Sequence, residues 1–78
     1  MVNIVLVGAG KLGSRHLQAL SQIEIMGTNL FVIDPSSEAR SIAENRFHEM
    51  PSNSAIASVT YLESIGNLKI SDIELVVV

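Results

Sequence analysis

The pattern of apolar and polar positions predicts alternating strands and helices. Val2–Val7 is a nearly continuous run of β-branched and leucine side chains, which is typical of a parallel strand covered on both faces. Between Leu12 and Ile23 the apolar positions recur at helical spacing. A second apolar run, Leu30–Ile33, follows. The start of the chain therefore predicts a strand, a helix and a second strand.

Turn-forming residues mark the ends of these elements. Gly27 is expected to end the first helix, with the turn at Thr28-Asn29. Asp34-Pro35 ends the second strand. Ser36 or Ser37 is expected to cap the next helix, because a serine hydroxyl accepts a hydrogen bond from the N–H groups at a helix N-terminus.

The second half of the chain continues the alternation. The buried stripe of the second helix is expected to consist of Ala39, Ile42, Ala43 and Phe47. A third strand is expected over Ser58–Leu62, a short irregular or helical connection over Glu63–Lys69, and a last strand over Ile73–Val78. This order predicts an α/β fold, a partial Rossmann fold, with a parallel sheet of order 3-2-1-4 and helices on both faces.

The chain ends inside the apolar run Ile73–Val78, with no turn or polar cap after it. We therefore interpret residues 1–78 as the N-terminal part of a dinucleotide-binding domain, truncated after the fourth strand and lacking the catalytic and substrate domain. An apolar edge strand is a template for pairing with another chain, so self-association through this strand is expected.

A glycine motif lies where the first strand meets the first helix. It reads Gly8-Ala9-Gly10-Lys11-Leu12-Gly13, and Asp34 follows 21 residues beyond its last glycine. A strand before the motif, a helix after it and an acid about 20 residues on are the context of a dinucleotide-binding site. The alternative is a glycine-rich turn that binds no ligand.

Each glycine has a separate expected task. Gly8 permits the tight turn out of the strand, Gly10 lets a pyrophosphate approach the backbone, and Gly13 lets the helix lie close to the strand. The phosphates would meet the N–H groups and positive dipole of the helix N-terminus. The complete set of candidate cofactor-binding residues is Gly8, Gly10, Lys11, Leu12, Gly13, Arg15 and Asp34.

Asp34 indicates which dinucleotide is preferred. Its carboxylate can accept hydrogen bonds from the adenosine ribose hydroxyls, and it would repel a 2′-phosphate, so NAD is the expected cofactor. NADP stays open, because Ser36, Ser37 and Arg40 lie just beyond and a serine or arginine accommodates a 2′-phosphate. Alternatively, Asp34 acts only as an Asx-type cap.

The remaining polar residues predict no catalytic site and no metal site. His16 lies on the buried stripe of the first helix, where a hydrogen-bonded packing role is the simpler interpretation. His48 fits a partner for the C-terminal dipole of the second helix. No serine stands in a nucleophile elbow.

Composition narrows the function classes further. Seventy-eight residues make one small domain, and the absence of cysteine excludes disulfides and thiolate metal sites. The net charge is −3 and the five basic residues form no run, so nucleic-acid binding is not expected. The longest apolar runs are far shorter than the roughly 20 residues that span a bilayer. A cytoplasmic protein without a membrane partner is therefore expected.

The stretch from Val7 to Leu17 resembles the start of the glucose–fructose oxidoreductase / inositol dehydrogenase family (Gfo/Idh/MocA). Members commonly carry the pattern G-x-G-x-x-G-x-x-H-x-x-x-L, which Gly8, Gly10, Gly13, His16 and Leu20 match. The Asp34-Pro35-Ser36 corner and the closing Ile73–Val78 run are similar to the family's second-strand ending and fourth strand. Only the first-helix region is specific.

The resemblance implies an NAD(P)-dependent oxidoreductase that acts on a sugar, polyol or related substrate by hydride transfer. The family's catalytic lysine follows a fifth strand, so neither Lys11 nor Lys69 inherits that role. The chain alone is expected to hold the adenosine-pyrophosphate half of the site and to be inactive. The alternative is a regulatory module that senses a nucleotide without catalysis.

Overall fold

A computed structural model describes residues 2–8, 10–68, 73 and 75–77. Strands and helices alternate along the chain, as the hydrophobic pattern predicted. In chain order the elements are β1 (Val2–Val7), α1 (Lys11–Leu20), β2 (Thr28–Ile33), α2 (Ser37–His48), β3 (Ile56–Leu62), the 3₁₀ turn η1 (Ile65–Asn67) and β4 (Leu75–Val77).

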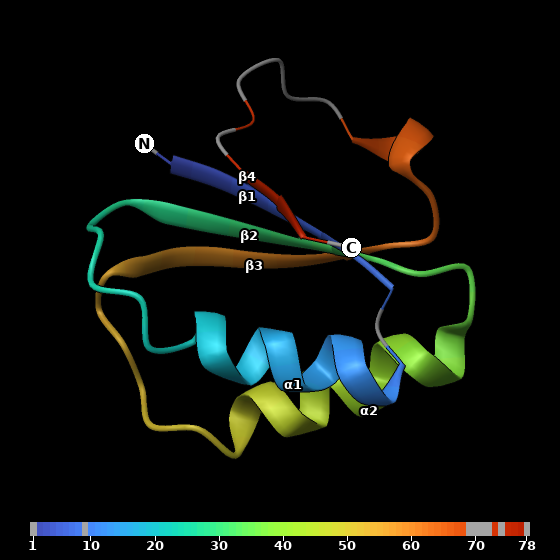
Figure 1. Ribbon diagram of the computed structural model, residues 1–78, viewed down its shortest axis with the longest axis horizontal. Helices are drawn as coiled ribbons and strands as arrows, with labels where there is room; N and C mark the ends of the chain where they lie inside the picture. The colour runs from blue at the N-terminus through green and yellow to red at the C-terminus, as the bar shows by residue number, and fades with distance from the viewer. Residues whose placement is uncertain (1, 9, 69–72, 74, 78) are drawn as a thin grey trace.

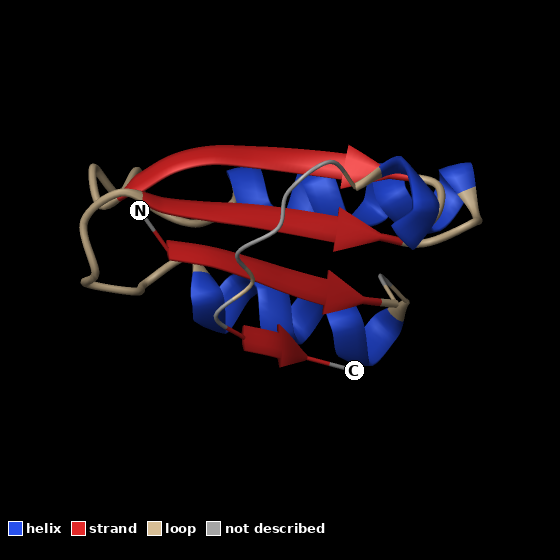
Figure 2. Ribbon diagram, turned by 90° about the horizontal axis from the view of Figure 1, so that it is seen from above, coloured by secondary structure: helices blue, strands red, loops and turns tan. Residues whose placement is uncertain are grey.

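The four strands form one parallel sheet with the order β3-β2-β1-β4, which confirms the predicted topology (Figure 2). β1 is central and pairs with β2 from Val2↔Thr28 to Val7↔Ile33. On its other side β1 pairs with β4. A bulge at the start of the β2–β3 pairing shifts the register between Thr28 and Asn29. All four strands therefore present their carboxyl ends at one edge of the sheet.

Both α-helices pack against the same face of the sheet (Figure 1). Alternate residues of the strands face them and join the helices in one apolar cluster. Its buried members are Ile4, Leu6, Leu17, Leu30, Val32 and Ala43. Helices were expected on both faces; among the described residues, the other side of the sheet carries only η1 (Figures 1 and 2). One face of the sheet is therefore covered by α1 and α2.

The end of the first helix differs from the prediction. α1 ends at Leu20, not near Gly27, because Ser21 caps it and Ser21 Oγ donates to the Gln18 carbonyl. Gly27 instead has a positive φ of 77° in the turn before β2. Its carbonyl accepts a hydrogen bond from Val2 N–H. Glycine is thus used here for a turn between elements rather than for a helix end.

The predicted turn at Thr28-Asn29 is also wrong, since both residues belong to β2. Thr28 is fully buried, and its hydroxyl donates to the Ile25 carbonyl. Asn29 Nδ2 donates to Asn3 Oδ1 of β1, and Ser58 Oγ of β3 donates to Asn29 Oδ1. These cross-strand partners satisfy polar groups that in isolation favour a turn, so the strand starts two residues earlier than its apolar run.

The second helix begins as predicted at a serine cap. Ser36 Oγ accepts a hydrogen bond from Ala39 N–H at 3.1 Å. Ala43 is fully buried, whereas Ile42 is 42% exposed and does not belong to the buried stripe. The helix meets the sheet along the i, i+4 line of Ala39, Ala43 and Phe47, and Ile42 lies to one side of that line.

The later elements follow the prediction with shifted bounds. β3 begins at Ile56, two residues earlier than expected. The connection after it contains η1. The described part of the predicted last strand is Leu75–Val77 at the edge of the sheet, where Val76 is 49% exposed. Lys69, Glu74 and Val78, which the prediction also covered, lie outside the described residues.

Candidate functional site

The candidate site is the carboxyl edge of the sheet, where β1 passes into α1. Gly8 is the first residue after β1 and has φ +93°, a backbone conformation that favours glycine. Its N–H donates to the Ile33 carbonyl at 2.7 Å, which fastens the exit of β1 to the end of β2. The predicted role of Gly8 in a tight turn therefore agrees with its geometry.

Gly13 lies in α1 against the backbone of Gly8. A Cβ built on Gly13 would fall deep inside the van der Waals radius of the Gly8 carbonyl oxygen and 2.7 Å from the Gly8 carbonyl carbon. Only a residue without a side chain fits there. The close approach predicted for this glycine is therefore present, and it brings the first turn of α1 directly against the end of β1.

Gly10 is the N-cap residue of α1, and its surroundings differ from those of Gly13. A Cβ built on Gly10 would meet no heavy atom within 4 Å. Gly10 has no side chain with which to cap the helix, and the first turn of α1 contains no acidic residue. The protein itself does not require glycine at this position for packing, so the space beside it is open.

Lys11 and Leu12 are the first two residues of α1, so their backbone belongs to the helix N-terminus. Ala9 and the side chains of Lys11 and Leu12 lie outside the described residues. Arg15 is exposed on the second turn of the same helix. Lys11 and Arg15, the basic residues of α1, therefore lie in its first two turns. An anion at this edge of the sheet would interact with the positive end of the helix dipole.

Asp34 follows β2 and lies at the same edge. Its N–H donates to the Leu62 carbonyl of β3 at 3.0 Å, which continues the sheet pairing by one residue. Its Oδ1 accepts a hydrogen bond from Ser36 N–H at 2.8 Å. The carboxylate thus forms the Asx-type turn considered above. Asp34 and Gly8 lie at the ends of neighbouring strands.

The two histidines lie apart from each other. His16 is half-buried on α1, and its ring has no hydrogen bond to another described residue, so the predicted hydrogen-bonded packing role is not seen there. His48 is the last residue of α2 and is exposed, with Nε2 3.9 Å from Glu44 Oε2 one turn earlier. In the described part of the chain no three His, Asp or Glu side chains form a group suited to a metal ion.

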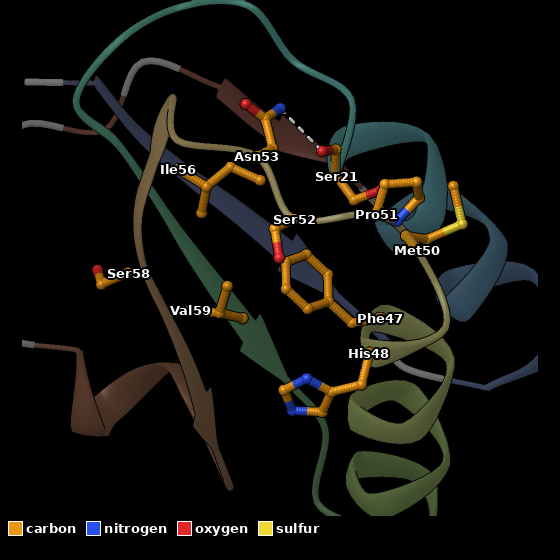
Figure 3. Close-up of a pocket in the computed structure, with 10 residues that line it drawn as sticks. All are labelled: Ser21, Phe47, His48, Met50, Pro51, Ser52, Asn53, Ile56, Ser58 and Val59. Atoms are coloured by element: carbon orange, nitrogen blue, oxygen red, sulfur yellow. Dashed lines mark hydrogen bonds between the residues drawn. The ribbon is translucent and has the colours of Figure 1, made fainter.

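A pocket of about 310 Å³ lies at the opposite, amino edge of the sheet, and sequence reasoning missed it (Figure 3). Its walls come from the ends of both helices, the loop before β3 and the start of β3. The lining residues are Ser21, Phe47, His48, Met50, Pro51, Ser52, Asn53, Ile56, Ser58 and Val59. In the sequence the loop appeared only as a polar turn after the second helix. Nothing in that pattern indicates which distant segments the loop meets.

Asn53 organises the wall of this pocket. Its Nδ2 donates to the carbonyls of Ser21 at 2.9 Å and Ile23 at 2.7 Å (Figure 3). Its Oδ1 accepts a hydrogen bond from Ala55 N–H at 3.0 Å. The amide is thus engaged by the protein's own backbone on both of its atoms, and it ties the loop before β3 to the end of α1.

Tyr61 on β3 has a strongly shifted pKa. Burial raises the pKa of its phenol to about 12, and the nearby negative charge of Glu44 adds to the effect. The hydroxyl is buried and has no hydrogen-bond partner. It lies on β3 beneath α2, within the helix-covered face and apart from the glycine loop.

No helix in the described residues has the length and apolar character needed to span a membrane. Comparison of the chain with protein-family models, with curated proteins and with solved structures finds no significant match. The resemblance stated above therefore rests on the motif residues alone, and the fold is established by the sheet order and the crossovers of this chain.

Proposed function

We propose that this chain binds the adenosine and pyrophosphate parts of NAD at the carboxyl edge of its sheet. The observation that carries this proposal is the contact of Gly13 with the Gly8 carbonyl. That contact sets the N-terminus of α1 beside the end of β1, while open space remains at Gly10. A phosphate bound there would interact with the N–H groups and the positive dipole of the α1 N-terminus.

Asp34 supplies the second half of the proposed site. It stands one residue beyond Ile33, whose carbonyl accepts the Gly8 N–H, so it is adjacent to the glycine loop. Its carboxylate would accept hydrogen bonds from the ribose hydroxyls of the adenosine. A dinucleotide lying across the ends of β1 and β2 would thus have its pyrophosphate at Gly10 and its ribose at Asp34.

We further propose that the function served is that of a cytoplasmic NAD-dependent oxidoreductase acting on a sugar, polyol or related substrate. NAD, when bound, supplies the hydride chemistry, and the described residues of this chain hold and orient its adenosine end. The motif residues that resemble the Gfo/Idh/MocA family support this substrate class. No residue of the chain is assigned a catalytic role, so we expect the 78-residue chain to bind without turnover.

Gly10→Ala tests the proposal, because a methyl group there enters open space and leaves the protein's own packing intact. We expect calorimetric titration with ADP and NAD to show binding to the natural chain and a loss of about tenfold or more in affinity in the variant, roughly the worth of one charge-assisted phosphate contact. Stability should change by less than about 1 kcal/mol.

Gly66→Ala is the matched control, since Gly66 lies in η1 and its Cβ would make only an ordinary 3.7 Å contact with Ser64 Oγ. ADP affinity should be unchanged in this control. Absence of ADP and NAD binding to the natural chain, or equal binding by Gly10→Ala, would contradict the proposal.

A further inference from the structure

We propose that two copies of this chain pair through the outer edge of β3 and form a weak dimer with two-fold symmetry. β3 is the last strand on its side of the sheet, and among the described elements none lies beyond it (Figure 2). This edge is opposite to β4, through which self-association was expected from the sequence. The dimer does not depend on the proposed NAD site.

Alternate residues of β3 direct their backbone hydrogen-bonding groups away from the sheet. The Leu62 carbonyl accepts a hydrogen bond from Asp34 N–H at the end of β2, so Leu62 faces β2. Because successive residues of a strand direct their N–H and C=O groups to opposite edges, Ser58 and Thr60 face β2 as well. The residues between them present both groups at the outer edge: Ala57, Val59 and Tyr61. Such an unpaired row is a template for another strand.

β3 lacks the features that usually protect an edge strand from pairing. Natural edges are commonly blunted by lysine, by proline, by short length or by a bulge within the strand. β3 has seven residues and contains neither a charged residue nor a proline. The register irregularity of the β2–β3 pairing lies at its start, between Thr28 and Asn29. Since Ala57 and Ser58 are also exposed, the edge is accessible to a second strand.

The sequence of β3 fits a second copy of itself in the antiparallel direction. A two-fold axis at Val59 places Val59 opposite the second copy's Val59, and Ala57 opposite the second copy's Tyr61. These are the residues with outward backbone groups, so each pair can exchange two hydrogen bonds. Val59 and Tyr61 lie on the helix-covered face. There the pairing sets two β-branched side chains together and a large side chain beside a small one, which suits cross-strand packing.

The other face of β3 and the charge of the chain favour the same occupant. In this register Ser58 lies opposite the second copy's Thr60, and hydroxyl pairs across strands are stabilising. The chain has a net charge of −3, but β3 is uncharged, so two copies can meet along it without opposing like charges. One strand pair buries less than the roughly 1,200 Å² of a stable interface. We therefore expect a dissociation constant on the order of 100 μM.

Two measurements on the natural chain test the pairing. Sedimentation equilibrium should show a monomer–dimer equilibrium centred on that concentration. Amide hydrogen exchange, followed by nuclear magnetic resonance, should slow at Ala57, Val59 and Tyr61 by about fivefold at about 1 mM, where roughly a fifth of the chain stays monomeric. The Ser58 and Thr60 amides should change little, because they already face β2.

Two matched double variants test the register. Ser58→Lys with Thr60→Glu places opposite charges across the two-fold axis, whereas Ser58→Lys with Thr60→Lys places like charges there. Both lose the same hydrogen bond from Ser58 Oγ to Asn29, so they differ only in the sign of one charge. The first should dimerise at least about tenfold more tightly than the second. Circular dichroism reports whether each variant is folded.

The outcomes decide which surface and which occupant are involved. Slowed exchange at the three outward β3 amides, together with the charge effect, would support the dimer. A natural chain that is monomeric at about 1 mM would overturn it, since any occupant of the edge would then be a different protein. Slowed exchange at Val76 of β4 without change at the β3 amides, or equal association of the two folded double variants, would overturn it as well. None of these results bears on the proposed NAD site.

Discussion

The two edges of the sheet use their polar groups in opposite ways. At the amino edge, side chains bind the protein's own backbone: Asn53 joins the carbonyls of Ser21 and Ile23 to the Ala55 N–H. At the carboxyl edge, Gly10 is the N-cap of α1, and no side chain of a described residue forms a capping hydrogen bond there. At one edge the side chains bind the backbone, and the other edge carries the N-terminus of α1.

This difference explains why a pocket by itself does not mark the candidate site. The 310 Å³ pocket lies at the amino edge, where Asn53 has already engaged the surrounding carbonyls (Figure 3). The carboxyl edge instead combines the two features that favour an anion, a helix N-terminus and open space at Gly10. The binding that we propose at the carboxyl edge would depend on the helix N-terminus there, whereas the side chains at the amino edge serve the fold.

The largest effect is expected at the carboxyl edge, from Gly13→Ala. The new methyl group would clash with the Gly8 carbonyl, and backbone cannot move aside as a flexible side chain can. We expect the free energy of unfolding to fall by about 3 kcal/mol or more, a large part of the stability of a domain of this size. Urea denaturation followed by circular dichroism measures it.

Gly66→Ala serves as the control for that variant too, and its stability should lie within about 0.5 kcal/mol of the natural chain. A Gly13→Ala variant as stable as this control would show that α1 does not lie against Gly8. The contrast between the edges would then lose its structural basis.

At the amino edge we expect a smaller loss, from Asn53→Ala. The change removes three hydrogen bonds to backbone groups, and we expect a cost of about 2 kcal/mol in the free energy of unfolding. ADP affinity at the other edge should stay unchanged under conditions where the variant is folded. Ser52→Ala, an exposed neighbour in the same pocket wall, is the control and should be nearly neutral.

A fall in ADP affinity in Asn53→Ala comparable to that expected in Gly10→Ala would contradict the separate roles of the two edges. It would mean that the two edges are coupled or that the ligand binds at the amino edge. Titration calorimetry on the three proteins, each checked for folding, decides between these results.

The smallest predicted effect on stability concerns Tyr61, which lies on β3 between the two edges of the sheet. It is the only tyrosine and the chain has no tryptophan, so ultraviolet absorbance reports its ionisation alone. Because burial raises the pKa of Tyr61 to about 12, the titration midpoint should lie near that value in the folded chain. In urea it should return to about 10, the ordinary value.

The sign of the pH effect follows from that shift. The contribution of Tyr61 to stability is fully present below about pH 10 and is lost as the pH rises through its folded pKa of about 12, because the unfolded chain ionises first. Tyr61→Phe should remove this dependence and leave neutral-pH stability equal or slightly higher, since the hydroxyl has no partner. Glu44→Gln should lower the midpoint only slightly. A folded midpoint near 10 would contradict the burial of the phenol.

The apolar periodicity and the capping residues predicted which helices and strands form. They did not predict where several of these elements begin or end. β1 and the Ser36 cap lie where the apolar run and the serine placed them. The end of α1 and the start of β2 were predicted wrongly, because both depend on distant partners. Asn53 binds the chain just after α1, and Asn3 and Ser58 satisfy Asn29 within the sheet. A polar residue such as asparagine favours a turn unless a neighbouring strand provides partners for its hydrogen bonds.

The same division holds for the candidate site. The strand–helix alternation and the conformation of the glycine turn could be predicted from the sequence, because periodicity and the conformational freedom of glycine are local properties. The sheet order followed from the general rule for parallel crossovers. The folded structure was needed to show which atom Gly13 lies against, namely the Gly8 carbonyl oxygen, and that Arg40 donates to the Asp34 carbonyl. These are through-space contacts, and they exist only once parallel crossovers have brought the strand ends and helix starts to one edge of the sheet.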